Sequence, residues 1–217
     1  MGLIAIGDIH GCRDALDRLL ERLEPTPEDH LIFIGDYIDR GPDSAGVIER
    51  LLELRETIPC TFLRGNHEEM MLNYLMHGEL DLWMYNGGRE TLKSYQNALG
   101  EIVIPETHIQ FIQQTLLFFD TPHFFFVHAG LHPSLTIVEN LERCLSHTFL
   151  WERSHLQVDE WAWEKPVVCG HTPQPEPINE EKLICIDTGC VYYTYASYGK
   201  LTAVRLPERL FVQVACP

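Results

Sequence analysis

Short apolar runs alternate with helical patterns over roughly the first 70 residues of the chain. Apolar runs of strand length occupy residues 3–7 (LIAIG), 30–36 (HLIFIGD) and 60–66 (CTFLRGN). The leucines of segment 16–23 are spaced i, i+3, i+4, i+7, as on one face of a helix, and a second helical pattern covers 44–56. This order predicts a β-α-β-α-β series, with parallel neighbouring strands and ligands at the carboxyl ends of those strands.

The pattern changes along the rest of the chain. Residues 67–117 are predicted to be mostly helical, and 139–147 is the one convincing helix beyond them. Strand-like runs separated by short turns cover 123–129, 165–171, 182–189, 201–207 and 209–215. No internal repeat or linker interrupts the sequence. We therefore expect an α/β protein in which one domain, residues 1–217, is built on two mixed sheets.

Composition narrows the class of partner. Hydrophobic residues make up 45% of 217 residues, and the formal net charge is −16. An acidic chain is a poor match for nucleic acid or an anionic membrane, so we expect neither as partner. Seven cysteines show no CxxC spacing, which favours free buried thiols in a reducing cytoplasm over a disulfide or zinc framework. The beginning of the chain does not resemble a signal peptide, and no run is long enough to span a membrane.

Polar residues recur where the predicted strands end. Asp8 and His10 follow the first strand, and in an extended segment residues two apart point to the same side. The alternative is an ordinary turn that caps the next helix. Asp, Asn or His beside glycine recurs at later strand ends, at Asp36, Asn66, His128, His171 and Asp187. A set of O and N ligands without thiolate suits Mn, Fe or Zn. Two ions need a shared carboxylate, and Asp36 is the candidate because its strand is expected to be central.

The motifs GDIHG, GDYIDRGPDS, RGNHE, VHAG and GH, in this order, resemble the phosphoprotein phosphatase branch of the calcineurin-like metallophosphoesterases. VHAG, in place of a CHGG-like form, and WMYNGGRETLKSY are similar to its bacterial and phage members. The resemblance covers about residues 2–190. It implies a sandwich of two mixed β-sheets flanked by helices, with metals at the rim.

The resemblance also implies roles for individual residues. Asp8 and His10 would hold one metal, Asp36 would bridge, and the second metal would bind Asn66, His128 and His171. His67 would be the general acid, oriented by Asp39. The substrate phosphate would contact Arg40, Asn66 and Arg153, although Arg153 could instead be a surface arginine.

We therefore expect a metal-dependent serine/threonine protein phosphatase that uses two divalent ions, Mn first, with Fe, Zn and Mg as alternatives. Its partner would be a phosphorylated protein or peptide, and the enzyme a cytoplasmic monomer. One alternative is a symmetrical diadenosine tetraphosphate hydrolase, but such relatives usually have a form like GDLVARG, without the counterpart of Asp39. The other alternative is an inactive binding protein, which the complete set of ligands argues against.

Overall fold

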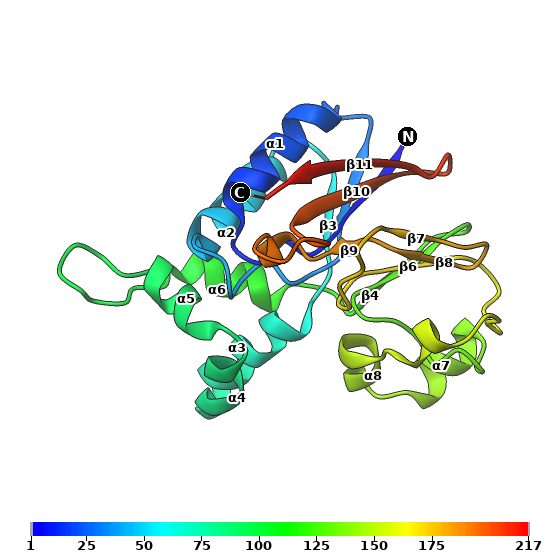
Figure 1. Cartoon of the computed structure of the whole chain (residues 1–217). Coiled ribbons are helices and arrows are strands. Elements are labelled where there is room, and N and C mark those ends of the chain that lie inside the picture. The colour runs from blue at the N-terminus through cyan, green and yellow to red at the C-terminus, as the bar shows by residue number, and fades with distance from the viewer. Residues whose placement is uncertain (1, 217) are drawn as a thin grey trace.

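The computed structural model describes residues 2–216 and contains the predicted β-α-β-α-β series (Figure 1). Strands β1 (Leu3–Ile6), β2 (His30–Phe33) and β3 (Cys60–Phe62) are parallel neighbours. Helix α1 (Arg13–Leu23) joins the first pair and α2 (Ser44–Leu54) the second. The leucine spacing predicted for α1 is confirmed, because those four side chains are all buried against the sheet.

Three later strands complete this first sheet. β10 (Lys200–Leu206) pairs antiparallel with β1, and β11 (Leu210–Ala215) and the short β9 (Asp187–Thr188) both pair with β10. The order is β11-β10-β1-β2-β3. The expectation that the second strand is central was wrong: β10 and β11 arrive from the end of the chain and make β1 the middle strand.

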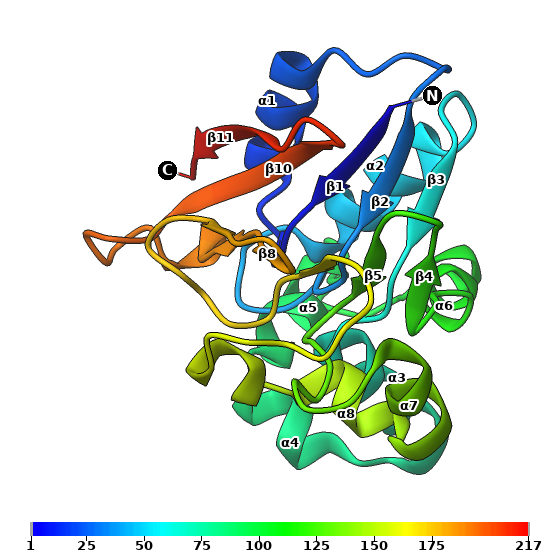
Figure 2. The same ribbon diagram turned by 90° about the vertical axis from the view of Figure 1, so that its right-hand side faces the viewer.

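The second sheet is also mixed. Its order is β4-β5-β6-β8-β7, with β5, β6 and β8 parallel and the two edge strands antiparallel. Its strands are β4 (Phe118–Asp120), β5 (Phe125–Val127), β6 (Val167–Cys169), β7 (Ile178–Asn179) and β8 (Leu183–Cys185). Figure 2 shows this sheet facing the first. The predicted fold class is confirmed, but edge strands β4 and β7 were not predicted, because runs of three and two residues are too short to show the alternation of a strand.

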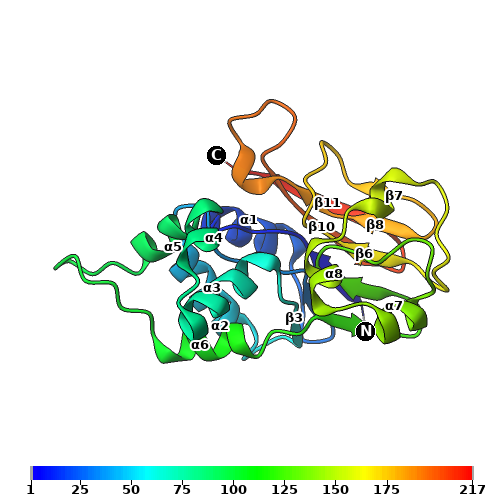
Figure 3. The same cartoon turned by 90° about the horizontal axis from the view of Figure 1, so that it is seen from below.

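The helices between the two halves follow the prediction for 67–117. They are α3 (Asn66–His77), α4 (Leu80–Tyr85), α5 (Gly88–Ser94) and α6 (Glu106–Gln113). In Figure 3 the segment between α5 and α6 projects away from the body. The single helix expected over 139–147 was wrong. α7 (Ile137–Arg143) ends at an extended Cys144, and α8 (Ser146–Trp151) starts anew after it.

Three apolar clusters hold these layers. One lies between the first sheet and helices α1–α3, and another between the second sheet and α7 and α8. The third joins the two sheets through fully buried side chains such as Ala5 and Ile32 on one side and Phe126 and Ile184 on the other. Each Å² of apolar surface that such side chains remove from water stabilises the fold by about 25 cal/mol. This inter-sheet cluster therefore fixes the position of one sheet's loops against the other's.

The cysteine expectation needs one correction. Cys190 and Cys216 form a disulfide, with their Cα atoms 5.7 Å apart, whereas the other five cysteines are free. The pair is 26 residues apart in sequence and meets only because β10 and β11 fold back on β9, so spacing could not reveal it. No helix within residues 2–216 combines the length and apolar character needed to cross a membrane.

Candidate active site

The site is built by loops at the carboxyl ends of parallel strands in both sheets. Several loop residues adopt left-handed backbone conformations, which turn the chain sharply. Their φ angles are +47° at His10, +53° at Asp36, +72° at Asp39, +67° at Arg40 and +67° at His171. Such values are uncommon outside glycine and often mark functional sites. The extended geometry expected around His10 was wrong, since the chain turns there before α1 begins.

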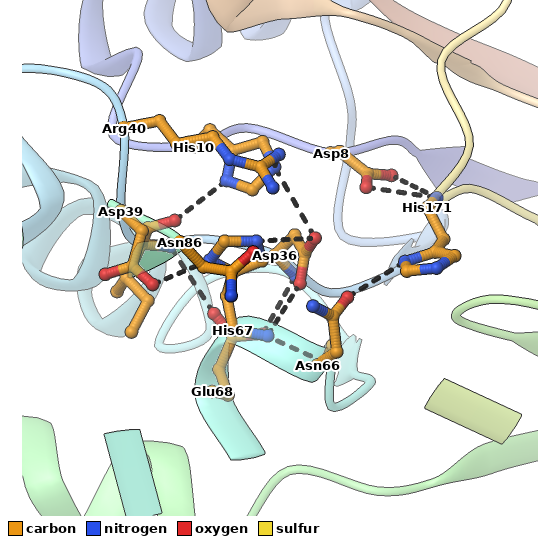
Figure 4. Close-up of polar contacts among 12 residues, drawn as sticks. Asp8, His10, Asp36, Asp39, Arg40, Asn66, His67, Glu68, Asn86 and His171 are labelled. Atoms are coloured by element: carbon orange, nitrogen blue, oxygen red, sulfur yellow. Dashed lines mark hydrogen bonds and ion pairs between the residues drawn. The ribbon is translucent and has the colours of Figure 1, made fainter. Parts of the chain in front are cut away.

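Asp36 lies at the centre of the site (Figure 4). Its Oδ2 is 3.5 Å from His10 Nε2 and 3.9 Å from His67 Nε2, and its Oδ1 is 3.5 Å from His128 Nε2. A glycine is required alongside, because a Cβ at Gly65 would come 2.0 Å from Asp36 Oδ1. Asp36 therefore faces imidazoles from three separate loops, although its strand is not the central one.

Two overlapping groups share this carboxylate. His10, Asp36 and His67 place one ligand atom each within 4.8 Å of one another, and so do Asp36, His128 and His171. The second group matches the predicted second metal site. The first contains His67 in the place where Asp8 was expected. A carboxylate common to two clusters is the arrangement that a pair of divalent ions requires.

Backbone carbonyls orient two of these rings. His10 Nδ1 is 2.9 Å from the carbonyl of Ile38, and His128 Nδ1 is 3.0 Å from that of Ile34. A ring that donates through Nδ1 turns an unprotonated Nε2 toward Asp36, as a metal ligand needs. The donor set of buried carboxylates, imidazoles and an amide thus fits divalent metal.

Asp8 and Asn66 complete the predicted ligand set. The Asp8 carboxylate accepts from the backbone N–H of His171 at 3.1 Å, so it lies beside the second group. Asn66 Oδ1 lies 3.1 Å from His128 Nε2 and 2.9 Å from His171 Nδ1. All six predicted ligands are buried and converge on one place, with Asp8 on the His171 side of Asp36 (Figure 4).

Burial and neighbouring charges shift the pKa values of the groups in this pocket in different directions. Burial, with Asp187 and Asp36 nearby, raises the pKa of Asp8 well above its usual value. Burial would also raise the pKa of Asp36, but the His128, His67 and His10 rings outweigh it and hold that pKa low. Burial lowers the pKa of His10 and His128. Burial thus favours the neutral rings that bind metal, whereas the neighbouring Asp36 carboxylate favours the charged ones.

His67 and Asp39 form a buried pair next to the metal ligands. His67 Nδ1 lies 2.6 Å from Asp39 Oδ2, and both side chains are fully buried. Asp39 also accepts from Trp83 Nε1 at 3.0 Å and from the Thr91 hydroxyl at 2.6 Å. His67 Nε2 is a buried atom without any hydrogen-bond partner, and it faces Asp36. An imidazole held at one nitrogen and free at the other can deliver a proton.

Two arginines lie at opposite sides of the centre. Arg40 Nη1 donates to His10 Nε2 at 2.9 Å, and Arg153 Nε donates to His171 Nε2 at 3.2 Å. Arg153 is exposed, yet it is located at the site rather than on a remote surface. Planar guanidinium groups so placed can bind phosphate oxygens. The phosphate-binding role of both arginines stays a prediction.

Sequence reasoning assigned no role to Glu68. Its buried carboxylate accepts from the backbone N–H groups of Gly65, Asp36 and Tyr37 at 2.8–2.9 Å. Burial and the nearby Asp36 raise its pKa to about 7. The carboxylate thus holds the Asp36 loop against the start of α3. Trp83 and Thr91 were also missed as supports of Asp39, although both lie in the quoted WMYNGGRETLKSY segment, at a distance in sequence that only the fold closes.

The chain is similar to known proteins over most of its length. The family model of the calcineurin-like phosphoesterases matches residues 1–202. The chain is 29% identical to bis(5'-nucleosyl)-tetraphosphatase PrpE [asymmetrical] of Oceanobacillus iheyensis, over 99% of this chain and 92% of that protein. It is 45% identical to serine/threonine-protein phosphatase 1 of Salmonella typhimurium over 84 residues, which are 38% of this chain and 37% of that one.

A solved structure provisionally described as a diadenosine tetraphosphatase has the same fold, with a TM-score of 0.72 at 24% identity over 99% of this chain and 93% of the other. The family match covers most of the chain and contains every predicted site residue. The chain therefore belongs to the calcineurin-like phosphoesterases, as its strand-end motifs predicted.

Proposed function

We propose that this phosphoesterase is a serine/threonine protein phosphatase that hydrolyses phosphomonoesters. The observation that carries the proposal is the His67–Asp39 pair, in which Nδ1 is 2.6 Å from a buried carboxylate and Nε2 is free. A phosphoserine or phosphothreonine leaves as an alkoxide, which is a poor leaving group without a proton. An imidazole held in this way supplies that proton, which is typically worth about 10²–10⁴-fold in rate.

The chain's own residues have separate tasks in this mechanism. Arg40 and Arg153 bind the phosphate oxygens from two sides, and Asn66, which contacts His128 and His171, assists them. His67 gives its Nε2 proton to the leaving oxygen, and Asp39 orients the ring and stabilises its charged form. Two divalent ions, held by Asp8, His10, Asp36, Asn66, His128 and His171, would activate a water and polarise the phosphate.

We propose manganese as the first choice for both ions, with Fe, Zn and Mg as alternatives, because the ligand set contains oxygen and nitrogen but no thiolate. We also propose that the enzyme is monomeric and cytoplasmic. Its partner would be a phosphorylated protein or peptide. Two hollows flank the centre, one of about 480 Å³ beside Arg40 and one of about 220 Å³ beside Asn66. They offer room for residues on both sides of a phosphorylated side chain.

A second candidate is hydrolysis of dinucleoside tetraphosphates, supported by similarity to PrpE along nearly the whole chain. The sequence alternative was the symmetrical reaction, whereas that relative is named for the asymmetrical one. The bond cleaved there releases a phosphate-type leaving group, which needs little protonation. The His67–Asp39 pair is therefore the feature that favours the monoesterase.

Competition in one tube separates the two candidates. Purified chain with manganese would receive a phosphothreonine peptide and diadenosine tetraphosphate together. We expect at least about tenfold higher kcat/KM for the peptide, equivalent to about 1.4 kcal/mol in transition-state binding. His67→Asn should reduce peptide hydrolysis far more than dinucleotide hydrolysis. A preference for the dinucleotide in the unmodified chain would contradict the proposal while leaving the metal ligands as described.

A further inference from the structure

Three of the seven cysteines gather outside the catalytic constellation. Cys12 lies in the loop after β1, Cys190 begins the short 3₁₀ helix η2 (Cys190–Tyr192), and Cys216 follows β11. Their sulfur atoms lie within 4.8 Å of one another, and all three residues are buried. Cys190 and Cys216 are bonded, so Cys12 is a third thiol beside an existing disulfide. The remaining cysteines do not belong to this group.

The disulfide closes the base of a loop that extends to the active site. Gly199 N–H donates to the Gly189 carbonyl at 2.9 Å, and Cys216 N–H donates to the Gly199 carbonyl at 2.7 Å. These contacts bring the two ends of segment 189–199 beside the end of β11, and Figure 3 shows that orange loop near the end of the chain. The S–S bond is the covalent tie across this junction.

Two residues after Cys190, Tyr192 contacts the phosphate-binding side of the site. The Arg40 guanidinium carbon lies 5.6 Å from the centre of the Tyr192 ring, in a cation–π arrangement. Tyr192 also lines the hollow beside Arg40. The position of this ring depends on η2, and η2 begins at the bonded cysteine.

A small reagent can approach the cysteines from outside. A cavity of about 120 Å³ is lined by Cys12, Cys216, Arg13 and Tyr193, among others. Cys216 itself is 6% exposed. Thiol–disulfide exchange proceeds through a mixed disulfide and needs access to one sulfur of the pair. The cavity provides that access on the Cys216 side.

We propose that Cys190 and Cys216 are a reversible thiol–disulfide site for low-molecular-weight thiols, and that the bonded state holds Tyr192 against Arg40. In the oxidation, Cys216 attacks a small disulfide RSSR, forms a mixed disulfide and releases one RSH. Cys190 then attacks the mixed disulfide and releases the second RSH. Two thiols thus lose two protons and two electrons, and RSSR is reduced to two RSH. Reduction by excess RSH reverses both steps.

The test combines peptide mapping with kinetics on an aryl phosphate, so it does not depend on the physiological substrate. Protein equilibrated in glutathione buffers of increasing oxidation would be alkylated, digested and mapped by mass spectrometry. We expect a disulfide-linked Cys190–Cys216 peptide that appears in the oxidising buffers and disappears again in the reducing ones. Its appearance should lower KM by about two- to fivefold, the range of an exposed cation–π contact, with little change in kcat.

Variants distinguish an effect of the Cys190–Cys216 disulfide from a general loss of structure. Cys216→Ser and Cys190→Ala should each fix KM at the reduced value under all buffers, while Cys144→Ser, a matched change at a free half-buried cysteine, should keep the redox response. Tyr192→Leu should retain the disulfide but lose the KM response. If Cys216→Ser and Cys190→Ala fail to fold, the KM of the reduced wild-type chain can still be compared with that of the oxidised one.

The proposal would be overturned by a cluster that remains three free thiols in oxidised glutathione, by a bond to Cys12 instead, or by stoichiometric zinc at the three sulfurs. A KM that is unchanged between the mapped oxidised and reduced states would equally overturn the link to Arg40.

Discussion

The two sheets contribute to the site in different ways. The first rim, the loops after β1, β2 and β3, carries Asp8, His10, Asp36, Asp39, Arg40, Asn66 and His67. Its loops bond to one another: Ile9 and His10 N–H both donate to the Asp36 carbonyl, and Glu68 closes the group. The second rim, the connections after β5 and β6, carries the two imidazoles His128 and His171 and also Arg153.

The second rim bonds to itself through Gly170 N–H, which donates to the His128 carbonyl at 2.8 Å, but its two imidazole residues are also anchored on the first rim. His128 Nδ1 bonds to the carbonyl of Ile34, and His171 N–H donates to the Asp8 carboxylate. Both rings also meet Asn66, across 62 and 105 residues of sequence. One half of the site is therefore formed by local loop structure and the other by the packing of two sheets. Substitutions should separate these two origins.

Asp36→Asn is expected to have the largest effect, because this carboxylate faces both rims. Neutralising it weakens two ligand groups at once, so the loss in kcat/KM should exceed the about 10²–10⁴-fold that one general acid supplies. Elemental analysis of Asp36→Asn, His10→Ala and Asn66→Ala would measure bound metal. If Asp36→Asn kept two ions per chain while Asn66→Ala kept one, the shared-carboxylate assignment would be wrong.

His67→Asn breaks the first rim without removing a predicted metal ligand. We expect kcat to fall by about 10²–10⁴-fold with metal content retained. The loss should be larger for alkyl phosphates than for aryl phosphates, since a phenolate leaves without much help. Asp39→Asn should act in the same direction, because its carboxylate holds His67 Nδ1. Equal losses on both substrate types would argue against the proton-transfer role.

The difference between the rims also explains what the sequence could predict. GDIHG, GDYIDRG and RGNHE are dense local motifs, so Asp8, His10 and Asp36 were proposed as ligands from the residues, whereas the roles of Asn66, His67, Asp39 and Arg40 came from the family resemblance. His128 and His171 stand alone at strand ends, where they were noted as candidate ligands, and only the family resemblance assigned them to the second metal. Glu68, Trp83 and Thr91 act by hydrogen bonds to loops elsewhere in the chain, and no local pattern marks such partners.

The errors have the same physical origin. β1 became the middle strand because β10 and β11 return from the end of the chain, and the same return joins Cys190 to Cys216. Apolar periodicity gives the existence of strands but not their order in a sheet. His10 was expected in an extended segment, whereas its φ of +47° follows from the turn into α1.

Glu68→Gln tests the internal support of the first rim. The amide would place N–H groups against backbone donors that now meet a carboxylate, so the Asp36 loop should loosen. Residues that support metal ligands typically contribute about 10–100-fold in affinity or activity, and we expect a loss in that range. Glu69→Gln is the matched control: the neighbouring side chain is half-buried and pairs only with Arg64 at 3.1 Å. Near-wild-type activity in Glu68→Gln would show that the Glu68 carboxylate does not support the active site.

Ile184→Val should have the smallest effect and is specific to the second rim. Ile184 is fully buried between the sheets and pairs in register with Val168, on the strand that leads to His171. Deleting one methylene should lower the free energy of unfolding by about 0.5–1.5 kcal/mol. It should also raise the manganese concentration needed for half-maximal activity, because the second rim moves slightly against the first.

Ile48→Val provides the comparison for this last effect. Ile48 lies in α2 and is equally buried, but it packs on the other face of the first sheet. Its loss of stability should be similar, yet its metal requirement should stay that of the wild type, since no contact between the sheets changes. Urea denaturation and manganese titration of the two variants measure both quantities. An equal rise in metal requirement in the two would mean that general loosening, rather than the packing of the sheets, controls how the second rim meets the first.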